Sequence, residues 1–367
     1  MSNNLSAFTP VKYSLKLVSK LWNETLYDKI ANTDYEGEIK DSGSSVVVRT
    51  EQDITLSTYT KGMTLVAQDL TPVSETMNVD QQFYFKFVVD DIDKMQNDIK
   101  TIDRHADNGR RQMAKKIDTD LFTYLHREAL GDNYVGTDYA TGTVTVTVTT
   151  GAVVGVGTTF TSAMVGMPFK ATGHTKYYTV ATFTNTTNIT ICDQGTFSSP
   201  VYTGGAIGGG TAYNIKAASA VALTKSTLYQ YLCTMGEKLD TSLCPQEGRF
   251  TVFNGKIKAI ARQMPEFIPA VNGAYENVVL SAKIGEIAGF KVFQSELIYG
   301  DNSTGYFIPF GDKGFLSFAM AIMKTAIVSS SVDANSFVDT CKGLLVWGRK
   351  VFDGTRPRGA ILRATFS

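Results

Sequence analysis

The hydrophobic pattern of the chain changes period at Asp90, and this change limits the possible folds more than any other feature. Before Asp90, residues 44–89 contain the β-branched and aromatic runs SSVVVRT, DITLSTYT, MTLVAQDL and TMNVDQQFYFKFVV, which predict long strands. In the last run Phe83, Phe85 and Phe87 share one strand face. The segment offers few pairing partners of its own and cannot bury itself. We therefore expect neighbouring copies of the chain to cover it.

After Asp90 the apolar residues recur at steps of three or four, which is the period of a helix. The spacing predicts one helix of about forty residues, roughly 60 Å long, that can bend at Gly109. Asp90, Asp91 and Asp93 fall in its first turn, where the helix dipole favours negative charge. The apolar stripe consists of Ile92, Met95, Ile99, Ile102, Ala106, Met113, Ile117, Leu121 and Leu125. The remaining mixed-charge face is either solvated or belongs to a helix that lies along a sheet.

Residues 139–213 differ chemically from the rest of the chain. They contain no Leu, Glu or Arg, and their charged side chains are Lys170, Lys176 and Asp193. Alternating Val and Thr in GTVTVTVTT, and again in YYTVATFTNTTNITI, predict strands. The glycine-rich run at 204–210 is expected to be the returning linker. An abrupt composition shift of this kind indicates a small all-β domain inserted into a larger one.

After the insertion the pattern is mixed, so the fold class is α+β. Thr224 is placed to cap a helix whose apolar stripe is Leu228, Leu232, Met235 and Leu239. GRFTVFN is expected to be a strand, Asn254 to cap the helix GKIKAIARQM, and IAGFKVFQSELI to be a further strand. The late runs YFIPF, FLSFAMAIM, GLLVWGRKVF and AILRATFS predict strands covered on both faces. Trp347 in the third of these is expected in the core.

The charge balance excludes some partners at the level of composition. Thirty-five basic and 35 acidic side chains give a net charge of zero, so there is no basic excess for wrapping nucleic acid or adhering to anionic membranes. The longest apolar segment, 315–328, is shorter than the roughly 20 residues of a membrane span, and no secretory signal is recognisable. We expect a cytoplasmic product. Its cysteines would then be reduced, small buried hydrophobes: Cys192, Cys233, Cys244 and Cys341.

The sequence offers no recognisable enzyme chemistry. His105, His126 and His174 lack the spacing of metal ligands, and the patterns of phosphate-binding loops and nucleophile elbows are absent. Neighbouring carboxylates such as Asp90 and Asp91 are better explained as helix capping. We therefore predict no catalytic, cofactor-binding or metal-binding residues.

The order of these elements resembles that of the major capsid proteins of tailed bacteriophages, whose fold is named after phage Hong Kong 97. Three segments carry the resemblance: YFKFVVDDIDKMQNDIK, CPQEGRFTVFNGKIKAI, and IGEIAGFKVFQSELI with the later GLLVWGRKVF. It covers roughly residues 40–130 and 215–367. The Thr-rich segment is outside this pattern and resembles the immunoglobulin-like or β-sandwich modules of phage structural proteins.

The resemblance implies a division of the chain into parts. Residues 1–43 would be an N-terminal arm, 44–89 an extended β loop lying over the adjacent subunit, and 90–138 the spine helix of a peripheral domain. Residues 139–213 would be the inserted all-β domain, which could be displayed outward, join neighbouring capsomers or help its own subunit to fold; we favour outward display. Residues 214–340 would form mainly the axial domain, and 341–367 the closing strands of the peripheral sheet.

The implied function is self-assembly into pentamers and hexamers that form an icosahedral head shell around a phage genome. The partners would be other copies of the chain, neighbouring capsomers, scaffolding, portal and cement or decoration proteins, and packaged double-stranded DNA bound without sequence specificity, but no membrane. The chain would be made in the host bacterial cytoplasm and end in the virion. Candidate inter-subunit contacts are Arg49, Glu51, Asp53, Lys61, Asp69, Arg104, Arg110 and Arg111.

Alternative functions remain open at the level of sequence. A tail or baseplate protein would form a ring, tube or trimer, and an encapsulin-like compartment would share the fold but package enzymes. An enzyme carrying a carbohydrate-binding β module would need a pocket with converging polar groups after residue 215.

Overall fold

The computed structural model of the chain describes most of its residues and divides them into two compact units. Within the described residues, unit 1 comprises Gln82–Lys115 and Ile322–Val346, and unit 2 comprises Thr25–Gln81, Lys116–Ala321 and Trp347–Ser367. The described residues are 25–35, 45–50, 54–69, 73–90, 101–128, 131–194, 196–197, 199–264, 285–328, 338–351 and 358–366.

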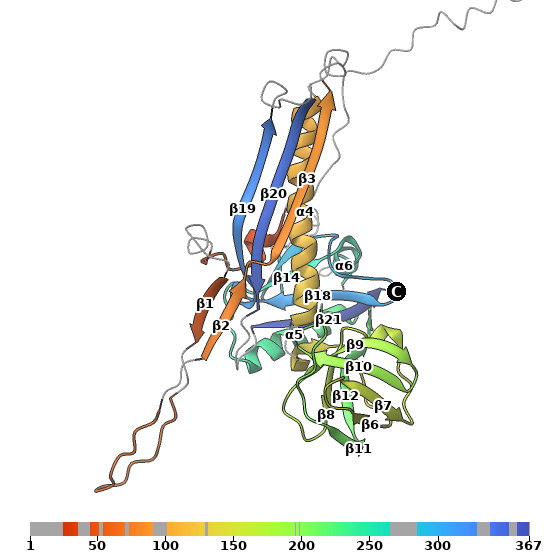
Figure 1. The fold of residues 1–367 in the computed structure, drawn as a ribbon. Helices are drawn as coiled ribbons and strands as arrows, with labels where there is room; N and C mark the ends of the chain where they lie inside the picture. The colour runs from red at the N-terminus through yellow and green to blue at the C-terminus, as the bar shows by residue number, and fades with distance from the viewer. Residues whose placement is uncertain are drawn as a thin grey trace, which may run out of the picture. The chain divides into compact units, whose positions relative to one another are not determined.

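Unit 1 combines a long helix with a three-stranded sheet. Strands β19 (Ser317–Val328), β20 (Val338–Lys350) and β3 (Gln81–Asp90) pair in that order beside α4 (Thr101–Glu128) (Figure 1). A Cβ atom at Gly109 of α4 would lie 2.5 Å from the Phe85 ring, and one at Gly343 of β20 would lie 2.4 Å from the same ring. The two glycines therefore let helix and sheet close around Phe85.

The helical period is confirmed, but the start of the helix differs from the prediction. Asp90 ends strand β3 and does not begin the helix, and residues 91–100 lie outside the described part. The helix continues through Gly109, where the missing side chain leaves room for the Phe85 ring. Ala106, Met113, Ile117 and Leu121 are buried, as the apolar stripe predicts.

Only the ends of the predicted β excursion form strands within its described residues. Strands β1 (Ser45–Thr50) and β2 (Val73–Asn78) pair antiparallel from Ser45 with Asn78 to Thr50 with Val73. Residues 54–69 between them contain no strand and are all exposed. The prediction of strands in the two middle runs is therefore wrong for residues 54–69, since no described segment forms a strand beside them.

One of the two eight-stranded sheets of unit 2 is mixed and holds a large hydrophobic core. Its order is β13-β21-β18-β14-β16-β15, with β17 beside β18 and β4 beside β21. Helices α5 (Leu228–Thr241) and α6 (Gly255–Ala261) contribute to the core of this sheet. The strands are β4 (Tyr134–Val135), β13 (Val221–Leu223), β14 (Phe250–Phe253), β15 (Glu286–Ile287), β16 (Phe290–Gln294), β17 (Gly300–Asp301), β18 (Gly305–Gly311) and β21 (Gly359–Phe366).

Most predictions for this region are confirmed. The stripe Leu228, Leu232, Met235 and Leu239 of α5 is buried. Asn254 caps α6, since its Oδ1 accepts a hydrogen bond from Ile257 N at 2.9 Å.

Other predictions need correction. Thr224 does not cap α5. The cap position is Thr227, and the two hydroxyl groups lie 3.1 Å apart in the preceding turn. Strands β20 and β21 join different sheets, because β21 pairs with β18 and β13. Cys233 is exposed, whereas the other three cysteines are buried.

The Thr-rich segment forms one antiparallel sheet in the order β11-β6-β7-β10-β9-β8-β12-β5. All eight strands follow one hydrogen-bonded order, whereas a sandwich of the immunoglobulin type has two separate sheets. Ile207–Thr211 lies in the predicted glycine linker but forms β11, with Ile207 buried and opposite Val146. The strands are β5 (Thr137–Tyr139), β6 (Thr143–Val146), β7 (Ala152–Val156), β8 (Pro168–Ala171), β9 (Tyr178–Asn185), β10 (Asn188–Asp193), β11 and β12 (Tyr213–Ser219).

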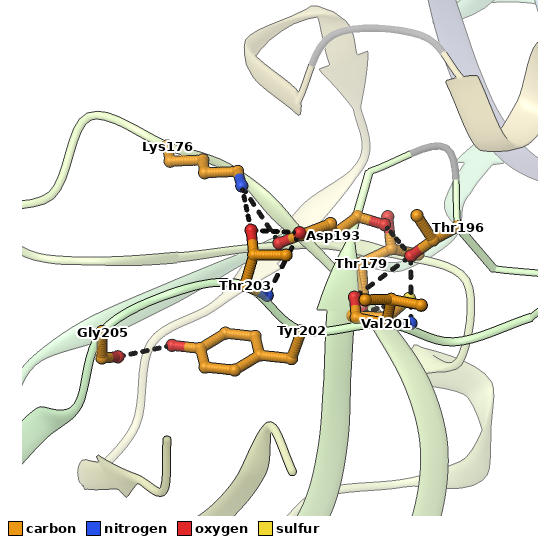
Figure 2. A network of polar contacts seen from close by, with 9 residues as sticks. Lys176, Thr179, Asp193, Thr196, Val201, Tyr202, Thr203 and Gly205 are labelled. Atoms are coloured by element: carbon orange, nitrogen blue, oxygen red, sulfur yellow. Dashed lines mark hydrogen bonds and ion pairs between the residues drawn. The ribbon is translucent and has the colours of Figure 1, made fainter. Parts of the chain in front are cut away.

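A polar network around Asp193 fixes the loop between β10 and β11 (Figure 2). The carboxylate pairs with Lys176 Nζ at 3.0 Å and accepts hydrogen bonds from the backbone N and Oγ1 of Thr203 at 3.1 and 2.5 Å. Partial burial acts to raise the pKa of Asp193, but these bonds outweigh it and lower the pKa. Tyr202 closes the loop by donating to Gly205 O at 2.7 Å.

Arg363 links the Thr-rich sheet to the mixed sheet. Its side chain is buried, and it donates to Ala217 O and Ala218 O, both at 2.8 Å, and to Thr304 O. Ala217 and Ala218 belong to β12, and Arg363 belongs to β21. A buried guanidinium whose donors meet backbone carbonyls avoids the cost of an unsatisfied charge.

The short helix α1 (Tyr27–Ile30) is fastened to α4 by Asp118. The buried carboxylate accepts hydrogen bonds from Leu26 N at 3.0 Å and Tyr27 N at 3.1 Å. Burial raises the pKa of Asp118 to about 6, although the two backbone donors act to lower it.

This raised pKa predicts a pH-dependent stability. The folded chain holds a proton on Asp118 more tightly than the unfolded chain, so the resulting stabilisation is complete below the ordinary pKa of 3.8 and lost as the pH rises through about 6. Relative to Asp118→Asn, the wild type should lose about 2 kcal/mol of unfolding free energy between pH 4 and pH 7. Urea denaturation of both proteins at each pH measures this difference. The contributions of the other titrating groups cancel, because both proteins contain them. A difference independent of pH would contradict the prediction.

Candidate assembly interface

Residues 54–69, here called the extension, present apolar side chains to solvent. Leu56 is 93% exposed and Val66 is 87% exposed. Further exposed apolar residues of the extension are Ile54, Tyr59, Met63 and Leu65. Contiguous exposed apolar surface of this kind marks an interaction site in soluble proteins. The extension is therefore the candidate for contact with another chain.

The described extension reverses direction at Gly62. Gly62 has φ 89°, a left-handed conformation that favours glycine, and Met63 N donates to Thr60 O at 3.0 Å across the turn. Its two arms are linked by Thr55 N donating to Gln68 Oε1 at 3.0 Å. These bonds close the turn without burying the apolar side chains.

The base of the extension is held by a small apolar cluster. Val46 of β1 and Met77 of β2 are buried with Ala319 of β19. Tyr35, Val48, Val79 and Ala321 pack around them. The two strands are thus fixed to the body of unit 2 while the extension beyond them is exposed.

A polar cluster adds a second anchor beside β2. Arg349 Nε lies 3.0 Å from Asp120 Oδ2, and its guanidinium lies over the Tyr124 ring at 4.6 Å. Trp347 is buried, as predicted, and donates to Asp120 Oδ2 at 3.1 Å. Burial raises the pKa of Asp120, and Arg349 and Trp347 act against that rise. Asp80, which follows β2, lies 3.9 Å from Arg349.

The charged residues that the sequence predicted as contacts lie on different elements of the structure. Arg49 is exposed on β1, and Lys61 and Asp69 are exposed in the extension. Glu51 and Asp53 lie outside the described residues. The helix residues Arg104, Arg110 and Arg111 are exposed on the part of α4 that belongs to unit 1.

Arg110 already has partners within its own chain. It pairs with Asp107 one turn away at 3.0 Å and donates to Thr325 Oγ1 at 3.1 Å. The contact residues predicted for this region were charged and did not include the exposed apolar residues of the extension, although the segment as a whole was expected to be covered by neighbouring copies of the chain. Their signal was present, since apolar runs with no pairing partner must either find one in another chain or stay exposed.

The described histidines do not form a metal site. His126 is buried against Tyr299 and Phe307, with ring centroids 4.7 and 3.8 Å away, and burial lowers its pKa so that it is neutral at pH 7. Among the described residues, no group of three metal-binding side chains occurs. No helix in this part of the chain is both long and apolar enough to cross a membrane.

Solved phage structures share the fold of this chain. A chain of Mycobacterium phage Che8 has a TM-score of 0.65 at 15% identity, with 97% of both chains covered. A chain in the capsid structure of cyanophage P-SCSP1u has a TM-score of 0.62 at 12% identity, covering 100% of this chain and 96% of that one. A chain of the bacteriophage PhiM1 mature capsid has a TM-score of 0.55 at 10% identity, covering 97% and 92%.

No protein-family model and no curated protein matches the sequence. The chain thus has the α+β fold of phage capsid chains, although its sequence has diverged far from theirs.

The contact between Asp120 and Arg349 predicts which substitution destabilises the base of the extension. Arg349→Met should lower the unfolding free energy by about 3 kcal/mol, because it leaves the largely buried Asp120 carboxylate without its cation. Lys342→Met removes an exposed cation from the same strand and should cost less than about 1 kcal/mol. Chemical denaturation measures both. Equal losses of unfolding free energy in the two variants would show that Arg349 contributes no more to stability than an exposed charge.

Proposed function

We propose that this chain is a major capsid protein of a tailed bacteriophage, which self-assembles into the head shell that encloses the genome. The observation that carries the proposal is the extent of the fold match, which covers 97% or more of this chain in each of three phage structures. A match over nearly all of both chains leaves little additional structure to which another activity could be assigned. The proposed role is structural and not enzymatic.

Within this role the fold would be of the Hong Kong 97 type. The long helix α4 beside a three-stranded sheet supports a spine helix in a peripheral domain, proposed for 90–138, and β20 would be the late strand that belongs to its sheet. The mixed sheet and α5 support an axial domain within 214–340. Residues 1–43 would be the arm and 44–89 the extended loop.

Residues 139–213 would be an inserted domain displayed on the outside of the shell. Its separate eight-stranded sheet and charge-poor composition support this proposal. The strand β11 would then belong to the domain and not to a linker.

Assembly would bury the extension against an adjacent subunit. Fully burying a side chain such as Leu56 or Val66 contributes roughly 1.5–3 kcal/mol. Arg49, Glu51, Asp53, Lys61 and Asp69 would add ion pairs worth about 0–1 kcal/mol each when exposed. Symmetry repeats these modest contacts around pentamers and hexamers. A single contact can therefore break and re-form, which lets misplaced subunits leave during assembly, while the sum of all contacts keeps the finished shell closed.

The partners would be other copies of the chain and neighbouring capsomers, together with scaffolding, portal or decoration proteins and the packaged double-stranded DNA. The final location would be the virion. Electron microscopy of the purified chain beside size-exclusion chromatography tests the proposal. Closed shells or capsomer-sized rings would support it. Tubes or a stable trimer would instead indicate a tail or baseplate protein, and shells that enclose enzymes would indicate an encapsulin-like compartment.

The extension predicts a variant that folds but does not assemble. The double variant Leu56→Asp with Val66→Asp should unfold within about 2 °C of the wild type, because both side chains are exposed in the single chain. It should form no shells, because two carboxylates would have to be buried against the neighbour.

Leu243→Asn is the matched control for this experiment. Leu243 is 72% exposed and has φ 57°, which asparagine tolerates well, so the control should fold and assemble like the wild type. Normal shells from the double variant, counted by electron microscopy, would exclude the extension from the subunit contact.

A further inference from the structure

His126, near the end of α4, lies where the Thr-rich sheet meets the mixed sheet of unit 2. On the side of the mixed sheet, its ring packs on Tyr299 and on Phe307 of β18, with centroids 4.7 and 3.8 Å away. On the side of the Thr-rich sheet, a Cβ atom at Gly166 would lie 3.2 Å from His126 Nε2. Gly166 precedes β8 and has φ 84°, which favours glycine. The imidazole thus fills the contact between the two sheets.

The surroundings of the ring fit a neutral imidazole. His126 is 3% exposed, and its Nδ1 is buried with no hydrogen-bond partner among the described residues. Tyr134 of β4 lies edge-on to the ring, and its hydroxyl donates to the backbone oxygen of His126. A protonated imidazole has a donor on each nitrogen, and a buried charge whose donors are unsatisfied is costly. Protonation is therefore disfavoured as long as the ring stays in place.

Among the described residues, the charged groups that act on His126 are both cations. Arg127 follows it on α4, and Arg363 of β21 lies over the Phe307 ring at 5.3 Å. The remaining neighbours are the two tyrosines, Phe307 and the backbone at Gly166, and none of these supplies a negative charge at or below pH 7. Burial lowers the pKa of His126 well below 6.5, and the two arginines lower it further.

Arg363 is also a tie between the sheets, since it donates to Ala217 O and Ala218 O of β12. A positive charge on His126 would repel this guanidinium. Proton uptake would therefore act on the junction twice, because it would place a charge in an apolar contact and weaken a neighbouring hydrogen-bonded one. Both effects are relieved if the two sheets separate locally and water reaches the ring.

We propose that His126 is an acid-sensitive latch, which holds the Thr-rich sheet on the mixed sheet while its ring is neutral and releases it when the ring is protonated. The proton comes from the solvent and binds a ring nitrogen, and no other covalent bond of the chain is made or broken. The latch makes the attachment of residues 139–213 depend on pH. It is a property of the single folded chain and so goes beyond the proposed function.

Acid favours the opened state of this junction. In the opened state the histidine is solvated and binds a proton with the ordinary pKa of 6.5, whereas the closed state has a lower pKa. The stabilisation of the closed state is therefore complete above pH 6.5 and is lost progressively as the pH falls below it. The effect is opposite to that of Asp118, whose stabilisation is lost as the pH rises.

Hydrogen–deuterium exchange of the full-length chain at pH 7 and pH 5, corrected for the intrinsic exchange rate at each pH, tests the proposal. In the wild type, segments 131–136 and 160–167 beside the junction should exchange at least about tenfold faster at pH 5. Helix α5, in the core of the mixed sheet, should stay protected. In His126→Phe the exchange of the two segments should not change with pH. His126→Leu repeats the test with a smaller side chain, should phenylalanine not fit beside Gly166.

His174→Phe is the matched control, because His174 is exposed in the loop after β8 and should leave the acid response of the wild type unchanged. The same acid response in His126→Phe and His126→Leu would overturn the proposal, as would a wild type whose two segments exchange equally at both pH values. Equal loss of protection in α5 would show that acid unfolds the mixed sheet as well, and would also overturn it. These measurements need no shell, so tubes or trimers, which would refute the proposed function, leave their result unaffected.

Discussion

The extension of this chain cannot bury its own apolar side chains, and much of the surrounding structure depends on that constraint. Leu56 and Val66 are almost fully exposed, and the bonds at Gly62 and Thr55 close the turn without covering them. The free energy of burying such residues is available only from contact with another molecule. Such a segment binds another chain more tightly if its base is rigid, because ordering a flexible base on binding would cost conformational entropy at every contact.

The base is rigid for two separate reasons. The apolar cluster of Val46, Met77 and Ala319 fixes the β1–β2 pair, and the Asp120 carboxylate joins Trp347 and Arg349 nearby. The polar anchor is costly to break, since a buried carboxylate without its cation is strongly destabilising. The buried apolar cluster thus fixes the position at which the extension starts. The ion pair between Asp120 and Arg349 adds a directional contact beside it.

The helix α4 shows how one element can serve several purposes. Asp118 holds α1, Asp120 holds Arg349, and Asp107 pairs with Arg110, so each of these acids is committed within the chain.

The sequence by itself determined the local elements: the helical period through Ile117 and Leu121, the buried stripe of α5, the Asn254 cap and the core position of Trp347. Its resemblance to phage capsid proteins was confirmed at the level of the fold. Only the tertiary structure decided that β20 and β21 join different sheets, that Ile207–Thr211 is a strand and that the extension is not. Periodicity and capping depend on residues a few positions apart, whereas strand pairing depends on which distant segment supplies the hydrogen bonds.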